Sequence, residues 1–280
     1  MPNAITVRGL KKSYGSFEAV KGVDFDVAEG ECFGILGPNG AGKTTTVEIL
    51  EGYRKRTAGE VTVLGLDPAD GTPTWRARLG MVLQTSRPTE ELTVAEVVGH
   101  FATFFDHPRD PAEVISLVGL DEKANVRAGK LSGGQQRRLD VALGIIGRPE
   151  LLFLDEPTTG FDPEARRQFW ALIEDLKRSG TTIVLTTHYL DEAEALTDRV
   201  VVIAGGEIKA MGAPATLGGR SSAASVVSWQ EGGETKSESS STPTRTIAEL
   251  GARFGGEVPG LLVQLPSLED IYLTLIGSPQ

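Results

Sequence analysis

The chain has 280 residues, of which 40% are hydrophobic, and a formal net charge of −10. This length allows one large α/β domain with a small additional unit, and the hydrophobic content suits a globular protein with a buried core. The acidic balance argues against a protein that coats nucleic-acid phosphates, so we expect no nucleic-acid partner. The single cysteine, Cys32, excludes an intrachain disulfide.

Neither a membrane span nor a secretory signal is expected from the sequence. No apolar run approaches the roughly 18 residues that a transmembrane helix needs. The N-terminus lacks the apolar segment of a signal peptide. We therefore expect a cytoplasmic protein, whose membrane partner, if it has one, is another polypeptide.

The N-terminal region predicts a mixture of antiparallel and parallel strands. Apolar and polar residues alternate over Ala4–Val7, Val23–Val27 and Glu60–Leu64, as in antiparallel strands with one solvent-exposed face. The continuous apolar run Cys32–Leu36 instead predicts a buried parallel strand.

A phosphate-binding loop follows that buried strand, and its sequence fits the pattern G-x-x-x-x-G-K-[ST]. Glycines let the backbone approach phosphates closely, and the free amides at the start of the next helix point at the anion. Lys43 would neutralise β- and γ-phosphate oxygens, and the Thr44 hydroxyl would bind Mg²⁺. The alternative is an incidental glycine-rich turn without a ligand. The candidate residues are Gly37, Pro38, Asn39, Gly40, Ala41, Gly42, Lys43, Thr44 and Thr45.

Residues from about 87 to 147 read as successive helices without strands, which predicts a separate helical lobe. Helices are expected over Thr93–Phe105, Ala112–Val118 and Gln135–Ile146. The aromatic residues at the end of the first of these are candidates for a docking groove, although packing inside the lobe is the simpler use for most of them.

A second anion cradle precedes the third of these helices, in the sequence Leu131-Ser132-Gly133-Gly134-Gln135. Ser132 can cap the helix or donate to a phosphate, and the first amides of the helix add further donors. Because Ser-Gly-Gly is a common way to begin a helix, a capped helix without a ligand is the alternative. The candidate residues are Ser132, Gly133, Gly134 and Gln135.

Two carboxylates follow the apolar run Leu151–Leu154, which predicts a second buried strand. The carboxyl ends of such strands are where α/β sheets hold their ligands. Asp155 would hold Mg²⁺ through water, and Glu156 would face the γ-phosphate as the general base for water. Taken alone, the pair would favour an acidic turn after a core strand; together with the phosphate loop, it favours the metal site.

The remaining chain predicts helices over Pro163–Lys177 and Tyr189–Leu196, and then a hairpin formed by Val200–Ala204 and Ile208–Met211. The composition changes after about residue 215, and the Ser-, Thr- and Gly-rich residues 221–246 resemble a disordered linker. We favour a small ordered unit, with strands at Ala224–Trp229, Thr235–Ser239 and Leu261–Leu265 and helices at Thr246–Phe254 and from Ser267 to Ile276. The expected division is 1–215 and 216–280.

Over residues 1 to about 215 these motifs, in this order, resemble those of an ATP-binding-cassette (ABC) transporter ATPase. The resemblance implies an α/β fold: a P-loop NTPase core of the ABC type with an antiparallel β subdomain, a helical lobe and a small α+β C-terminal appendage. It also assigns residues that no pattern above singles out. These are Tyr14, which would stack on adenine; Gln84, which would contact Mg²⁺ and sense the membrane partner; Asp162 of the D-loop; and His188, which would contact the γ-phosphate.

The resemblance further implies how the protein works. In this family the pentapeptide caps the γ-phosphate of a nucleotide held by the other subunit, so two chains enclose two ATP molecules head to tail. The expected cofactors are ATP and Mg²⁺. The expected partners are a second copy of the chain and a separate transmembrane permease, with the ATPase at the inner face of the cell membrane. The C-terminal sequence SLEDIYLTL resembles the tails of the antibiotic- and drug-export branch, of the daunorubicin-resistance type.

Two other functions fit the sequence less well than transport does. A soluble ABC ATPase of translation or DNA repair typically carries two cassettes or a long coiled coil, whereas this sequence has one motif set and no sustained heptads. A P-loop kinase or GTPase would not require Leu131–Gln135 together with His188. Transport by an exporter is therefore the leading hypothesis.

Overall fold

The computed structural model describes residues 2–82 and 91–277. Its centre is a six-stranded sheet in which every neighbouring pair is parallel except the last. The strands, in spatial order, are β5 (Leu79–Val82), β6 (Leu151–Asp155), β7 (Thr182–Thr186), β3 (Cys32–Leu36), β8 (Arg199–Ala204) and β9 (Glu207–Gly212). The sequence correctly predicted the β8–β9 hairpin and the buried strands β3 and β6.

A second, antiparallel sheet covers one face of the central sheet, in the order β2 (Phe17–Ala28), β1 (Asn3–Tyr14) and β4 (Ala58–Val63). The predictions Ala4–Val7 and Val23–Val27 were too short, because both strands run for 12 residues. Register shifts interrupt the pairing around Gly9, so the simple alternation of side chains is lost while the hydrogen-bonded ladder continues. Helix α1 (Lys43–Leu50) joins the same core.

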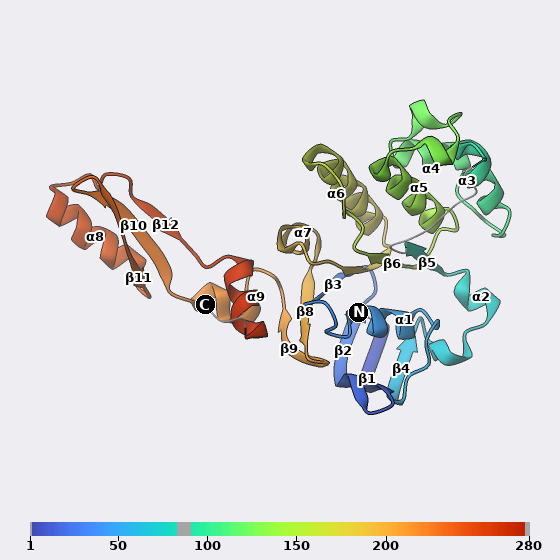
Figure 1. Ribbon diagram of the computed structural model, residues 1–280, viewed down its shortest axis with the longest axis horizontal. Helices are drawn as coiled ribbons and strands as arrows, with labels where there is room; N and C mark the ends of the chain where they lie inside the picture. Colours follow the sequence, from blue (N-terminus) through green and yellow to red (C-terminus); the bar gives the residue numbers. More distant parts are fainter. Residues whose placement is uncertain (1, 83–90, 278–280) are drawn as a thin grey trace.

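Helices cover the other face of the central sheet and share one continuous hydrophobic core with it. They are α3 (Val94–Ala102), α4 (Pro111–Leu117), α5 (Gly133–Ile145) and α6 (Pro163–Arg178). Figure 1 shows α3, α4 and α5 grouped as a lobe beside α6. The helix expected over Thr93–Phe105 ends at Ala102, and Phe104 beyond it is 66% exposed.

Short elements complete this part of the chain. They are α2 (Pro73–Arg76), α7 (Leu190–Leu196) and the 3-10 helices Pro68–Asp70, Asp121–Lys123, Ala128–Lys130 and Leu217–Ser222. Thr93 and Glu96 form a capping box at the start of α3, in which each side chain accepts the backbone N–H of the other residue.

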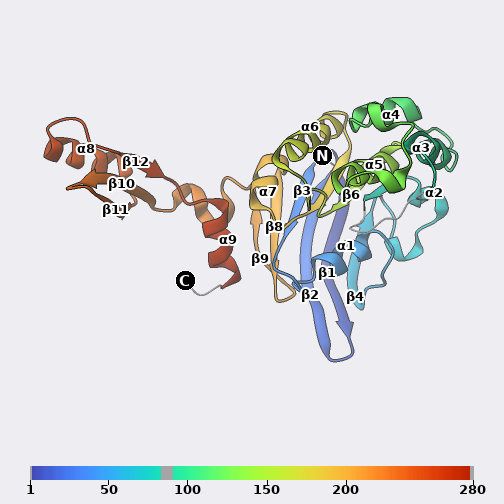
Figure 2. The same ribbon diagram turned by 45° about the horizontal axis from the view of Figure 1, so that its top comes forward.

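Residues 217–277 form helices and strands, as expected for an ordered unit. A three-stranded antiparallel sheet of β11 (Glu234–Ser240), β10 (Ser225–Glu231) and β12 (Leu262–Gln264) packs against α8 (Pro243–Phe254). Figures 1 and 2 show this unit extending away from the central sheet. Helix α9 (Leu268–Ile276) returns to pack on β8 and α7, where Leu268 and Leu275 join a small core. The division at residues 215 and 216 stays a prediction.

Candidate functional site

The predicted phosphate loop connects β3 to α1, and its lysine is held inside the loop. Lys43 is only 7% exposed, and its Nζ donates to the carbonyl oxygens of Gly37 at 2.7 Å and Pro38 at 3.2 Å. Burial lowers the pKa of Lys43, while the charges of Glu156 and Asp155 act in the opposite direction. A cation is therefore fixed where phosphate oxygens would enter the loop.

The loop requires glycine immediately before this lysine. Gly42 has a φ of 102°, and a Cβ at this position would lie 2.5 Å from the carbonyl oxygen of Ala19. Both the backbone angle and the close approach exclude a larger residue. The glycine of the G-K-T part of the motif is therefore required by its packing against β2.

A hollow of about 500 Å³ opens over the loop, within the size range of ligand pockets. Tyr14 stands at its edge, and two cations lie near the Tyr14 ring: Lys12 Nζ at 5.0 Å from the centroid and the Arg54 guanidinium carbon at 5.4 Å. These cations, which sequence reasoning missed, suit a ring that meets an anionic nucleotide. The lining residues are Tyr14, Phe17, Ala19, Asn39, Gly40, Ala41, Gly42, Lys43, Thr44, Thr45 and Glu156.

The carboxylate predicted as general base has an uncommon backbone conformation. Glu156 has a φ of 45°, in the left-handed region that a side chain of this size rarely adopts. Its N–H donates both to the carbonyl oxygen and to the hydroxyl of Thr186, at 3.0 and 3.2 Å. Strained backbone of this kind is typical of functional sites, where the surroundings hold it in place.

The structure brings Glu156 and His188 together. His188 Nδ1 lies 3.3 Å from Glu156 Oε1, and the histidine side chain is 44% exposed whereas that of the glutamate is 17% exposed. The two residues come from the ends of neighbouring strands β6 and β7. Glu156 lines the hollow over the phosphate loop, so its contact places the His188 imidazole next to a residue of that hollow.

The residues expected at the metal also fit one another. Thr44 and Asp155 both line a second hollow of about 280 Å³, and Asp155 Oδ1 accepts the hydroxyl hydrogen of Thr186. A hydroxyl and one oriented carboxylate suit Mg²⁺, which binds few protein ligands and keeps several waters. Gln84, the third expected ligand, lies outside the described residues.

An arginine that the sequence reasoning did not use supports this carboxylate segment. Arg137, buried in α5, donates to the carbonyl oxygen of Asp155 and, from Nε at 3.1 Å, to that of Pro157. It also pairs with Asp140 one turn along the helix. A charged residue on the buried face of a predicted helix was the one feature of the sequence that could have drawn attention to Arg137. The sequence does not predict that Arg137 contacts the end of β6.

The second cradle begins α5 through a complete capping box. Ser132 Oγ accepts the N–H of Gln135 at 3.3 Å, and Gln135 Oε1 accepts the N–H of Ser132 at 3.0 Å. The helix therefore begins at Gly133 and not at the predicted Gln135, because the cap satisfies the amides of the first turn. Since Ser132 Oγ only accepts in this box, its own hydrogen remains available for an anion.

Asp162 caps α6 beside this cradle, with Oδ1 accepting the N–H of Ala165 at 2.7 Å. The N-termini of α5 and α6 thus open into one hollow of about 430 Å³. Two helix N-termini favour a negatively charged ligand. The lining residues are Gly119, Ser132, Gly133, Gly134, Gln135, Arg138, Gly160, Phe161, Asp162 and Ala165.

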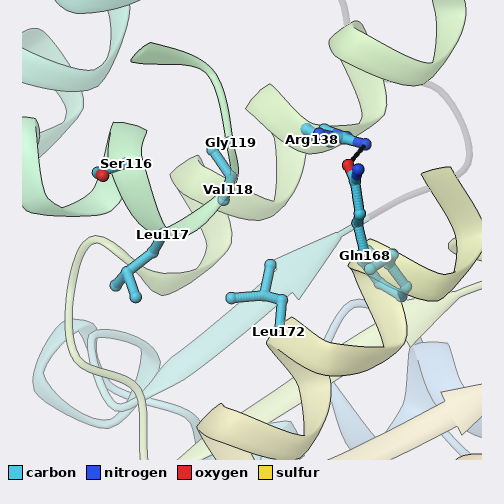
Figure 3. A pocket seen from close by; sticks show the side chains of 8 residues that line it. Ser116, Leu117, Val118, Gly119, Arg138, Gln168 and Leu172 are labelled. Carbon is cyan, nitrogen blue, oxygen red and sulfur yellow. Dashed lines mark hydrogen bonds between the residues drawn. The ribbon is translucent and has the colours of Figure 1, made fainter. Parts of the chain in front are cut away.

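A hydrogen bond from Arg138, one of these lining residues, also connects the two helices. Arg138 Nη2 of α5 donates to Gln168 Oε1 of α6 at 2.5 Å, and Figure 3 shows the two side chains reaching toward each other. A cavity of about 210 Å³ lies beside this bond, lined partly by Leu117 and Leu172. The hydrogen bond thus links α5 to α6.

Comparison with known proteins identifies the family. The family model described as "ABC transporter" matches residues 20–159. A Rhizobium sp. (strain N33) protein named "Nod factor export ATP-binding protein I" is 39% identical, over 98% of this chain and 97% of its own length. Among the described residues, no helix is long and apolar enough to cross a membrane.

Solved structures agree with the predicted fold class. A structure titled "Structure of ATP binding subunit of ABC transporter", 24% identical, covers 97% of this chain with a TM-score of 0.72 and supports the fold alone. A dimeric ATP-binding cassette in a post-hydrolysis state, bound to ADP and Pi, is 26% identical and covers 75% of this chain with a TM-score of 0.68. The chain therefore belongs to the ABC transporter family, as an ATP-binding-cassette ATPase coupled to transport.

Proposed function

We propose that this chain is the ATPase subunit of an exporter, that it pairs head to tail with a second copy, and that the pair drives a separate transmembrane permease from the cytoplasmic face of the membrane. The observation that carries the proposal is the division of the anion-binding groups. Lys43 and Ser132 lie in two separate hollows of one chain. A partner chain that supplies the missing half would complete each site.

In the first half of each site, the chain's own residues bind and orient Mg²⁺-ATP. Tyr14 stacks on the adenine, and the backbone of Gly37–Thr45 with Lys43 holds the phosphates. Thr44, Asp155 and Gln84 are the residues that would hold Mg²⁺, which when bound neutralises charge on the transferred phosphoryl group.

Hydrolysis is assigned to the pair Glu156 and His188. The Glu156 carboxylate would accept a proton from the attacking water, which requires an acceptor within hydrogen-bond reach of that water. His188, 3.3 Å away, would orient the carboxylate and contact the γ-phosphate. Gln84 would link this chemistry to the permease.

In the second half, the chain acts on its partner's nucleotide. The Ser132 hydroxyl and the amides of Gly133, Gly134 and Gln135 would cap the γ-phosphate held by the other chain, and Asp162 would lie beside that contact. Because the helix dipole and the free hydroxyl hydrogen favour an anion only at close range, turnover would depend on dimer closure.

Export, as against import, is supported by the printed name of the Rhizobium relative. Membership of the drug-export branch of the daunorubicin-resistance type is supported only by the tail resemblance, and the transported substrate is not assigned. A soluble ABC ATPase of translation or DNA repair is not favoured.

Glu156→Gln tests the proposal. The amide cannot accept the proton from water, so the variant should bind ATP, fail to hydrolyse it and accumulate as an ATP-bound dimer that sizing chromatography detects. Equal dimer populations with and without ATP would contradict the head-to-tail pair.

A further inference from the structure

Unpartnered buried polar atoms gather around one carboxylate, that of Glu192 in α7. Within the described part of the chain, both of its oxygens lack a hydrogen-bond partner, and so do Thr158 Oγ1, Trp170 Nε1 and Arg166 Nε. Glu192 is fully buried, with 0% exposure. A buried carboxylate without hydrogen bonds is costly, so a cluster of this kind needs an explanation.

Donors are nevertheless arranged around the carboxylate. The hydroxyls of Thr187 and Thr158 and the indole of Trp170 lie close enough to favour its charged form, and the positive charge of Arg166 acts in the same direction. Burial outweighs them and raises the pKa of Glu192. The donors therefore approach the carboxylate without completing hydrogen bonds of normal length and angle.

The position of these donors along the chain connects them to the proposed hydrolytic pair. Thr158 follows Glu156 by two residues, and Thr187 immediately precedes His188. Thr187 Oγ1 already accepts the N–H of Tyr189 at 3.0 Å, so its hydroxyl hydrogen is available to an acceptor such as Glu192. One buried carboxylate thus stands between the segments that carry the two functional side chains.

We propose that Glu192 is a positioning residue of the ATPase site, whose carboxylate accepts hydrogen bonds from Thr158 and Thr187 as the site closes and thereby sets the approach of Glu156 to His188. This inference rests on the roles proposed above for that pair. Glu192 is buried beneath the site and acts through its neighbours. Completing the bonds would remove the cost of the unpartnered atoms, so closure and correct positioning of the pair would occur together.

The test compares Glu192→Gln and Thr158→Val with Glu194→Gln in the purified full chain. Glu194 lies on the same helix but pairs instead with Arg220 at 2.8 Å, so it controls for loss of a charge from α7. Glu192→Gln and Thr158→Val should lower kcat by about 10- to 100-fold, as displacement of reacting groups does. The KM for ATP should stay within about 2-fold, because the Lys43 side of the site is untouched.

A double variant separates positioning from general damage to the core. If both single changes break the same contact, Glu192→Gln with Thr158→Val should lower kcat no further than either change alone. Melting temperatures measured in parallel show whether each variant is folded. Glu194→Gln should match the wild-type chain in kcat and KM.

Normal kcat in Glu192→Gln would overturn the inference. The inference would also fail if Glu192→Gln lowered kcat, ATP affinity and melting temperature together, and if its effect on kcat added to that of Thr158→Val in the double variant. Such a pattern indicates that Glu192 is a passive core residue. Glu156→Gln is measured beside these variants. ATP turnover in Glu156→Gln would refute the proposed function. If Glu156→Gln loses turnover but Glu192→Gln keeps a normal rate, only the role of Glu192 is refuted.

Discussion

Burial of Glu51 makes the stability of this protein depend on pH in a specific way. Glu51 follows α1, is only 6% exposed, and lines the same hollow as Thr44 and Asp155. Burial, with smaller contributions from the charges of Asp155 and Glu48, raises the pKa of Glu51 from 4.5 to about 7. An acid with a raised pKa binds its proton more tightly in the folded state, so stability is lost as pH rises from about 4.5 to about 7.

The size of the effect follows from the two pKa values. At about 1.4 kcal/mol per pKa unit, the difference costs about 3 kcal/mol near pH 8 and less than about 1 kcal/mol near pH 5. Glu51→Gln removes the titrating group. The free energy of unfolding of Glu51→Gln, relative to that of the wild-type chain, should therefore be about 2 to 3 kcal/mol higher near pH 8 than near pH 5.

Urea unfolding of the nucleotide-free chain at both pH values measures this difference. Glu60→Gln, which changes an exposed glutamate of β4, is the matched control and should shift little with pH. A stability difference between Glu51→Gln and the wild-type chain that is the same at both pH values would refute the argument from burial.

Two further predictions concern the separate halves of the site. Lys43→Ala removes the cation that is held against Gly37 and should weaken ATP binding by at least about 10-fold; unchanged affinity, measured by fluorescent-nucleotide titration, would contradict the phosphate-loop assignment. Ser132→Arg places a bulky side chain over the N-terminus of α5 and should abolish turnover while ATP affinity stays within about 2-fold; normal hydrolysis would exclude a role for Ser132 across the dimer.

The sequence predicted those parts of the site that are local in the chain. Lys43 and Thr44 follow from one loop pattern, and Asp155 and Glu156 from the end of one apolar strand. Ser132 was predicted both as a cap and as a phosphate donor, and the capping box confirms the first use. Local patterns succeed here because a turn or a helix terminus is determined by the residues within it.

The contacts that the sequence did not predict connect residues far apart in the chain. Arg137 reaches Pro157 across 20 residues, and Glu192 of α7 lies near Thr158, 34 positions earlier in the chain, because α7 packs against other elements, α6 among them. The length of β1 was underestimated for a different reason: irregular pairing near Gly9 removes the period-two pattern from which strands are predicted.

The central claim is that each site is shared between two chains, and mixing two inactive variants tests it most directly. In a head-to-tail dimer of a Lys43→Ala chain with a Ser132→Arg chain, one site carries both lesions and the other carries none. Random pairing of equal amounts makes about half of the dimers mixed, with one intact site in two, so ATPase activity should return to about a quarter of wild type. A mixture as inactive as either variant alone would contradict the shared site.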